Sequence, residues 1–90
     1  MERFYQYVEG EHWGFAYAML SPAYRARMSE AGLVARYSRY TSFDVTLRQR
    51  SDTSVVSRIT GIGPDGKRSL YVETVTLAWD GADWKITGLR

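Results

Sequence analysis

The chain has 90 residues, of which 44% are hydrophobic and 24% charged, and its net charge is +2. This length allows one domain with a thin core, and the composition is ordinary for a globular protein. The absence of cysteine excludes disulfides and thiolate metal sites. No apolar run approaches the roughly 18 residues of a membrane span. The arginines are too dispersed along the chain to predict a nucleic-acid-binding arm.

The chain opens with MERFYQYVEG, which is charged and aromatic where a secretory signal peptide would carry an apolar segment. We therefore expect no signal peptide in this chain. Two interpretations of its location stay open, namely a cytoplasmic protein and a domain that belongs to a longer, extracytoplasmic protein.

Helical spacing of apolar residues predicts helices over about residues 2–40. Phe4, Tyr7 and Val8 share one helical face, and Gly10 is expected to end this first helix. A second helix is predicted by apolar residues that recur on one stripe, namely Trp13, Ala16, Tyr17 and Leu20.

Two serines are expected to cap the helices that follow. Ser21 precedes Pro22, and proline suits the first position of a helix because its missing N–H would have no partner there. Ser29 is expected to cap one more helix, in which three residues share a face: Leu33, Tyr37 and Tyr40.

From residue 42 onward apolar and polar residues alternate, which is the period of a β-strand. Turn signals at 63–66 and 80–83 divide this region, and four antiparallel strands are predicted over about residues 42–89. Helices followed by a meander of strands predict an α+β fold, as a single domain over 1–90 with the helices packed on one face of the sheet.

The GPDG turn at 63–66 sets the register of the two central strands. A three-residue loop that ends at Gly66 places Ser57 opposite Glu73, and Glu73 then points to the face that the helices are expected to cover. A slip of one residue would instead place Glu73 outside, beside Arg58. The inner face is predicted to carry Phe43, Val45, Leu47, Val55, Ser57, Ile59, Tyr71, Glu73, Val75, Leu77, Trp79, Trp84 and Ile86.

The opposite, outer face of the sheet is rich in threonine and carries Arg48, Arg58 and Lys85. Its apolar residues, which are sufficient for a dimer interface, are Val56, Leu70 and Val72.

Two segments resemble the NTF2-like superfamily, which includes SnoaL-like and ketosteroid-isomerase-like proteins. The first is FYQYVEGEHWGFAYAMLSPAYRARM at 4–28, and the second is the final hairpin, LAWDGADWKITGL at 77–89. The resemblance implies a short member of the family: an NTF2-like cone, in which a curved four-stranded antiparallel sheet wraps around helices and an apolar cavity. It also implies frequent homodimers through the sheet. The family holds isomerases, cyclases and dehydratases as well as non-catalytic domains attached to larger bacterial proteins.

No catalytic motif of the family matches this chain position by position, and Glu73 is the candidate catalytic residue because a carboxylate in an apolar cavity can act as acid or base. A structural hydrogen bond is the competing interpretation. The only histidine, His12, is expected at the surface, and neither a metal site nor a cofactor is predicted. The candidate ligand-binding residues are Tyr17, Tyr37, Ser57, Tyr71, Glu73 and Trp79.

These observations favour a non-catalytic domain that binds a small apolar ligand or a protein partner. Such a domain can also be an accessory domain of a larger protein. One alternative is an isomerase-like enzyme that uses Glu73, and another is a scaffold that dimerises through the outer sheet face. No nucleic-acid partner is expected.

Overall fold

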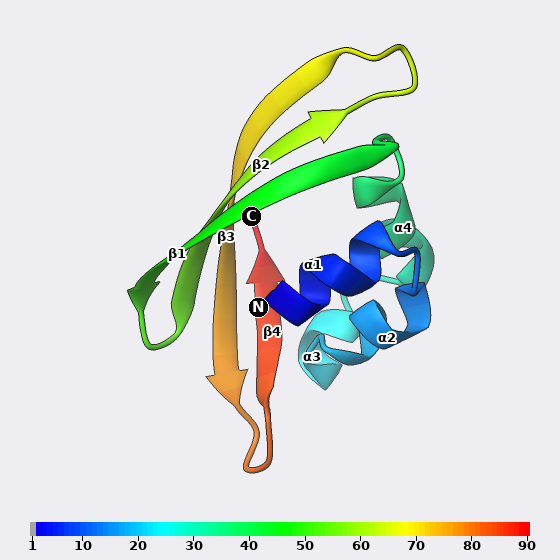
Figure 1. The fold of residues 1–90 in the computed structure, drawn as a ribbon. Helices are drawn as coiled ribbons and strands as arrows, with labels where there is room; N and C mark the ends of the chain where they lie inside the picture. The colour runs from blue at the N-terminus through cyan, green and yellow to red at the C-terminus, as the bar shows by residue number, and fades with distance from the viewer. Residues whose placement is uncertain (1) are drawn as a thin grey trace.

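The computed structural model describes residues 2–90 and is an α+β fold with four helices and one antiparallel sheet (Figure 1). The helices are α1 (Glu2–Glu9), α2 (Trp13–Ala18), α3 (Pro22–Arg25) and α4 (Glu30–Tyr37). The strands are β1 (Ser42–Ser51), β2 (Ser54–Ile62), β3 (Arg68–Trp79) and β4 (Trp84–Leu89). The predicted class and the order of the elements are confirmed.

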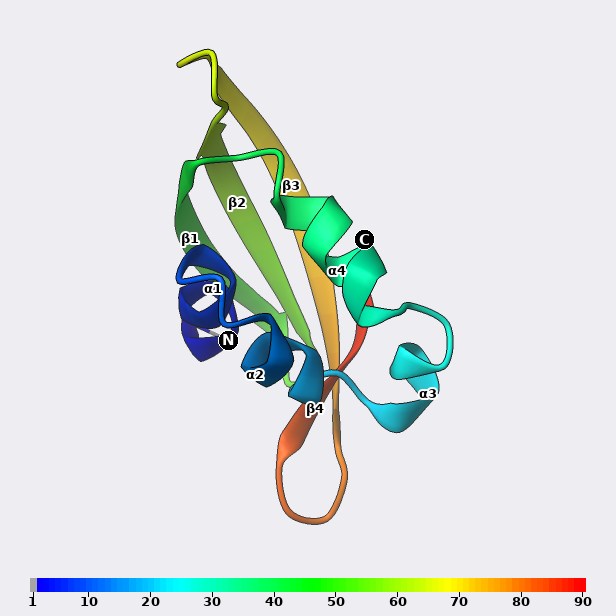
Figure 2. The same ribbon diagram turned by 90° about the vertical axis from the view of Figure 1, so that its right-hand side faces the viewer.

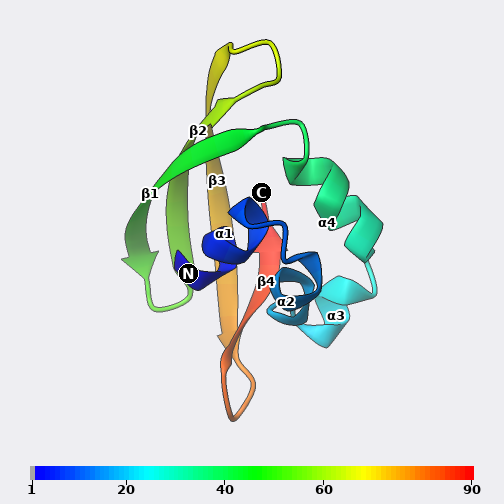
Figure 3. The same ribbon diagram turned by 45° about the vertical axis from the view of Figure 1, so that its right-hand side comes forward.

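The sheet is a meander in the order β1-β2-β3-β4, and the helices lie on one side of it (Figure 2). The strands twist strongly along their length, so that both ends of the long strand β3 extend past the helices (Figure 3). The β2–β3 hairpin rises beyond α4, and the β3–β4 hairpin extends beyond α3. A part of the inner sheet face therefore has no helix above it.

Both predicted serine caps are present. The Ser21 hydroxyl accepts a hydrogen bond from the Tyr24 N–H at 3.2 Å, with Pro22 at the first helical position of α3. The Ser29 hydroxyl accepts from the Gly32 N–H at 3.0 Å at the start of α4. Each hydroxyl satisfies an N–H that has no partner within its helix.

The register of the central strands is as predicted. Ser57 lies opposite Glu73, and Ile59 opposite Tyr71. Gly66 takes the left-handed conformation that the turn requires, with φ 78°, and the Gly63 N–H donates to the Lys67 carbonyl at 3.0 Å across the hairpin. The turn therefore aligns the strands so that Glu73 faces the helices.

The core lies between α1, α2, α4 and the inner face of the sheet. In α1 the buried residues are Phe4, Tyr5 and Val8. Tyr5 therefore occupies the buried position that helical spacing predicts for Tyr7, and Tyr7 is only half-buried. Helix α4 buries Leu33 and Tyr37 as predicted but ends at Tyr37. The remaining core residues are Ala16, Leu20, Val55, Ile59, Val75, Ile86 and Leu89.

The two edges of the sheet differ. The segment that links α2 to α3 lies along β4. In this segment Leu20 forms a parallel bridge with Ile86, and the Ser21 N–H donates to the Ile86 carbonyl at 2.8 Å. Tyr24 adds a second anchor, because its hydroxyl accepts from the Leu89 N–H at 3.1 Å. The β4 edge is thus partly covered, whereas β1 pairs on one side only, with β2.

Candidate functional site

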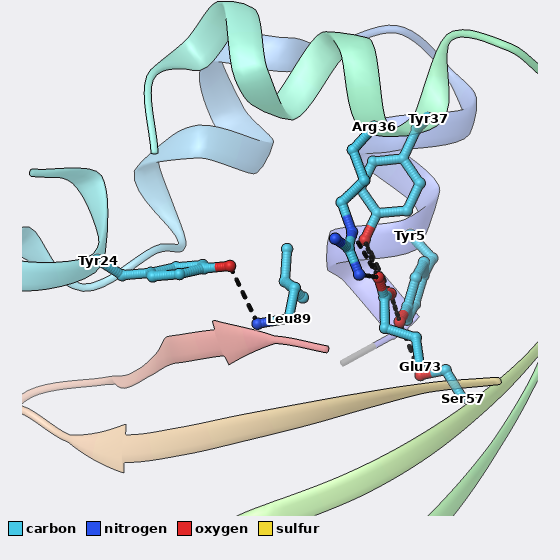
Figure 4. A network of polar contacts seen from close by, with 7 residues as sticks. All are labelled: Tyr5, Tyr24, Arg36, Tyr37, Ser57, Glu73 and Leu89. Carbon is cyan, nitrogen blue, oxygen red and sulfur yellow. Dashed lines mark hydrogen bonds and ion pairs between the residues drawn. The ribbon is translucent and has the colours of Figure 1, made fainter. Parts of the chain in front are cut away.

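Glu73 is the centre of a buried polar cluster between the sheet and the helices (Figure 4). It lies in the middle of β3 and its exposed fraction is 0%. A buried carboxylate costs free energy unless charges and hydrogen-bond donors surround it. Helices α1 and α4 supply those groups, since Tyr5 projects from α1, and Arg36 and Tyr37 project from the last turn of α4.

Three side chains donate hydrogen bonds to the carboxylate. The Tyr37 hydroxyl lies 2.9 Å from Oε1 and 2.8 Å from Oε2, the Tyr5 hydroxyl donates to Oε2 at 2.7 Å, and the Arg36 Nε donates to Oε1 at 2.7 Å. The Arg36 Nη2 also pairs with Oε1, which makes this the only salt bridge within residues 2–90. Both oxygens of Glu73 are therefore occupied by the protein itself.

Ser57 extends the cluster across the sheet. Its Oγ is fully buried and lies 2.7 Å from the Tyr5 hydroxyl. A tyrosine hydroxyl has a single proton, and the Glu73 carboxylate is the stronger acceptor for it. We infer that Tyr5 donates to Glu73 and accepts the Ser57 proton, so that the order of donation is Ser57 to Tyr5 to Glu73.

The cluster holds its tyrosines in the neutral form. Burial, followed by the negative charge of Glu73, raises the pKa of Tyr5 and of Tyr37 far above the usual value for tyrosine. Burial alone would lower the pKa of the Arg36 guanidinium, but its hydrogen bond and ion pair with Glu73 outweigh this and raise that pKa. The cluster thus consists of the Glu73 carboxylate, the neutral hydroxyls of the two tyrosines and the Arg36 guanidinium.

Tyr71 stands next to this cluster in a stack of side chains. Its ring packs against Tyr40 at 5.9 Å with the planes 17° apart, and the Arg39 guanidinium lies 5.2 Å from the Tyr40 ring and 5.6 Å from the Tyr71 ring. The Tyr71 hydroxyl is buried and has no hydrogen-bond partner within residues 2–90. Burial and the charge of Glu73 raise the pKa of Tyr71 to about 12.

The six predicted ligand-binding residues do not form one site. The structure brings Tyr37, Ser57 and Glu73 together, with Tyr71 beside them, but the Tyr17 hydroxyl binds the Met28 carbonyl at 2.9 Å, away from this cluster. Trp79 is 57% exposed and packs edge-on against Trp84. Trp79 and Trp84 pair at the end of the β3–β4 hairpin, which extends beyond the helices, so neither belongs to the core.

Two members of the cluster were not singled out by the sequence. Tyr5 was one of seven tyrosines, and Arg36 was one of ten dispersed arginines. The signal for Tyr5 was its spacing of three from Val8, which places both on one helical face. No local signal marks Arg36, since its partner lies 37 residues further along the chain.

An open groove occupies the inner sheet face that the helices leave uncovered. Its volume is about 620 Å3, and it lies at the end of the sheet where the β1–β2 and β3–β4 hairpins turn. Trp84, 47% exposed, forms part of its wall. The groove is lined by Met19, Leu47, Gln49, Asp52, Val55, Leu77, Trp84 and Ile86.

A smaller and more polar hollow lies between α1 and β1. Its volume is about 320 Å3, and the residues that line it include two acidic residues of α1, Glu2 and Glu9. Within residues 2–90 no group of three or more histidine or acidic side chains is arranged to hold a metal ion. None of the helices described for this part of the chain is long and apolar enough to cross a membrane.

Comparison of the chain with protein-family models, with curated proteins and with solved structures gave no match.

Proposed function

We propose that this chain is a non-catalytic, NTF2-like domain that binds a small apolar ligand in the groove beside Trp84. Two features support the NTF2-like assignment. The helices lie on the inner face of one twisted antiparallel sheet, and the apolar groove lies at one end of that face. The groove carries the functional proposal, because its volume falls within the range of small-molecule sites, about 300–1,000 Å3.

The chemistry of the groove favours an apolar ligand. Five of its lining residues are aliphatic or methionine, and Trp84 adds a large aromatic surface. Gln49 and Asp52 are exposed and supply polar groups at the rim. An uncharged ligand would displace water from the apolar wall, and its polar end would orient toward these two residues.

The environment of Glu73 supports a structural role for this carboxylate over an acid–base role. A general base must reach the proton of a substrate, either directly or through one water. The Glu73 side chain is completely buried, and Tyr5, Arg36 and Tyr37 already occupy its oxygens. An enzyme that used Glu73 would have to break these bonds in each turnover.

The proposal is tested with the neutral fluorescent probe N-phenyl-1-naphthylamine. We expect its emission to rise on binding and the tryptophan emission of the protein to fall, because Trp84 lines the groove. Leu77→Gln places an amide on the groove wall and should weaken probe binding by about tenfold, since burying an unpaired amide costs about 1–3 kcal/mol.

Leu70→Gln is the matched control, because Leu70 lies on the opposite face of the same strand and is 62% exposed. This variant should bind the probe as the parent protein does. Equal binding by both variants and the parent, or no probe binding by a folded parent protein, would overturn the proposal.

A further inference from the structure

The helices all lie on one side of the sheet and leave its outer face uncovered (Figures 1 and 2). Three aliphatic side chains form a diagonal patch on it, namely Val56 on β2 with Leu70 and Val72 on β3. Leu70 is 62% exposed and Val72 is 55% exposed. Exposed aliphatic residues grouped on a sheet face mark an interaction surface.

An arginine accompanies each aliphatic residue of this patch. Arg48 pairs with Val56 across β1 and β2, and Arg58 pairs with Val72 across β2 and β3. Arg68 lies two residues before Leu70 on the same face of β3. All three arginines are exposed, and none has an ion pair within residues 2–90.

The sign of the charge limits what can cover this face. Asp44 is the one carboxylate among the described residues of the outer face, against three arginines around the patch. A second copy of this chain, related by a two-fold axis, would bring like charges together, which is unfavourable at an interface. The face calls for a partner with carboxylates and apolar side chains.

The residue types also discriminate among anionic partners. Binding of single-stranded nucleic acid uses aromatic side chains on which bases stack, and segments that lie in a membrane interface commonly place tryptophan or phenylalanine on their apolar face. The described residues of the outer face include no aromatic side chain, since Tyr71, Trp79 and Trp84 belong to the inner face. Apolar residues interleaved with arginine fit a protein segment better.

We propose that the outer face docks an acidic amphipathic helix of another protein. Its apolar stripe lies on Val56, Leu70 and Val72, and its flanking carboxylates pair with Arg48, Arg58 and Arg68. A helix packed on a sheet face is the ordinary way in which proteins cover such a face. The site is separate from the ligand groove, which lies on the other side of the same sheet.

The test uses a synthetic helical peptide with a leucine stripe flanked by glutamates, and a second peptide with lysine in place of each glutamate. We expect the glutamate peptide to bind, to bind more weakly as salt is raised, and to shift the NMR signals of Val56, Arg58, Leu70 and Val72. The lysine peptide should not bind. Binding of both peptides alike, or of neither, would overturn the proposal.

Charge reversal locates the surface. Arg58→Glu should weaken binding of the glutamate peptide by about tenfold, and Leu70→Gln should also weaken it, while Leu77→Gln should leave it unchanged. Arg27→Glu is the matched control, since Arg27 is exposed and lies between α3 and α4. Arg48→Glu repeats the test on β1 if Arg58→Glu fails to fold. An unchanged affinity in a folded Arg58→Glu or Arg48→Glu variant would contradict the proposal.

Three further measurements can contradict it. Tighter binding of this face to anionic phospholipid vesicles, or to single-stranded DNA, would replace the protein partner with a membrane or a nucleic acid. Sedimentation that shows a dimer disrupted by Arg58→Glu would replace it with a second copy of this chain. Because Leu77→Gln and Leu70→Gln act on opposite faces, loss of ligand binding and loss of peptide binding are distinguishable.

Discussion

At the scale of single residues, the energetics of Glu73 depend on complete enclosure. Removing a carboxylate from water costs several kcal/mol, and the attraction of one cation offsets this only where the geometry is good and the other lone pairs are satisfied. Arg36 supplies the charge, and it is itself 28% exposed, so its own desolvation is incomplete. Tyr5 and Tyr37 supply the remaining donors, and they do so without adding another buried charge.

Replacing this carboxylate therefore has a predictable cost. Glu73→Gln keeps the size of the side chain but removes the charge, and it puts an amide N–H₂ where an acceptor is needed for a hydroxyl or for Arg36. We expect the free energy of unfolding to fall by about 3 kcal/mol, measured by urea denaturation followed by circular dichroism.

Glu9→Gln is the control for this substitution, since Glu9 is exposed and has no ion pair within residues 2–90. Its effect should stay within about 0.5 kcal/mol. A Glu73→Gln protein as stable as the parent would show that the cluster contributes no net stability.

At the scale of elements, helix α4 determines whether the cluster can form. Arg36 and Tyr37 lie in its last turn, and both reach Glu73 only if the helix keeps its rotation and its position over β3. Leu33 holds that position because it is fully buried one turn earlier on the same face as Tyr37. The helix has eight residues, a length that is not stable in isolation.

The Ser29 cap contributes measurably to so short a helix. Ser29→Ala removes the acceptor of the Gly32 N–H, and we expect a loss of about 1 kcal/mol in the free energy of unfolding. Ser38→Ala, at the other end of α4, is the matched control, because the Ser38 side chain is exposed and makes no hydrogen bond within residues 2–90. Equal losses in the two variants would argue against a specific role for the cap.

At the scale of the whole molecule, the buried tyrosines couple stability to alkaline pH. The pKa values of Tyr5, Tyr37 and Tyr71 are all raised in the folded state. A tyrosine in the unfolded chain has a pKa of about 10. Above that value the unfolded state loses protons that the folded state retains. The linkage then favours unfolding as pH rises.

We predict that the free energy of unfolding is insensitive to these tyrosines below pH about 9 and falls steadily as pH rises above about 10. Urea midpoints measured across this range would show the fall. The double variant Tyr5→Phe/Tyr37→Phe should have a shallower slope. The same slope in the parent and the double variant would contradict the assignment to these two residues.

Much of the fold was accessible from local patterns. The GPDG turn and the alternation of apolar residues predicted that Ser57 lies opposite Glu73, and the two serine caps were readable from the residues beside them. Tyr5 shows where such patterns fail, because a small rotation of the helix about its axis decides whether Tyr5 or Tyr7 is buried beside Phe4 and Val8. The exposure of Trp79 depended on how far the strands run past the helices, which no local pattern encodes.

The sequence by itself determined the order of the elements, the register of the two central strands and the inward direction of Glu73. These follow from it because a turn fixes the pairing of its own strands, and the strand period of two then carries that register along the sheet. Only the tertiary structure decided that Tyr5, Arg36 and Tyr37 meet on the carboxylate, and that the open groove lies at the other end of the sheet. Those contacts cross between layers, and they depend on how helices α1 and α4 rotate and settle on the sheet.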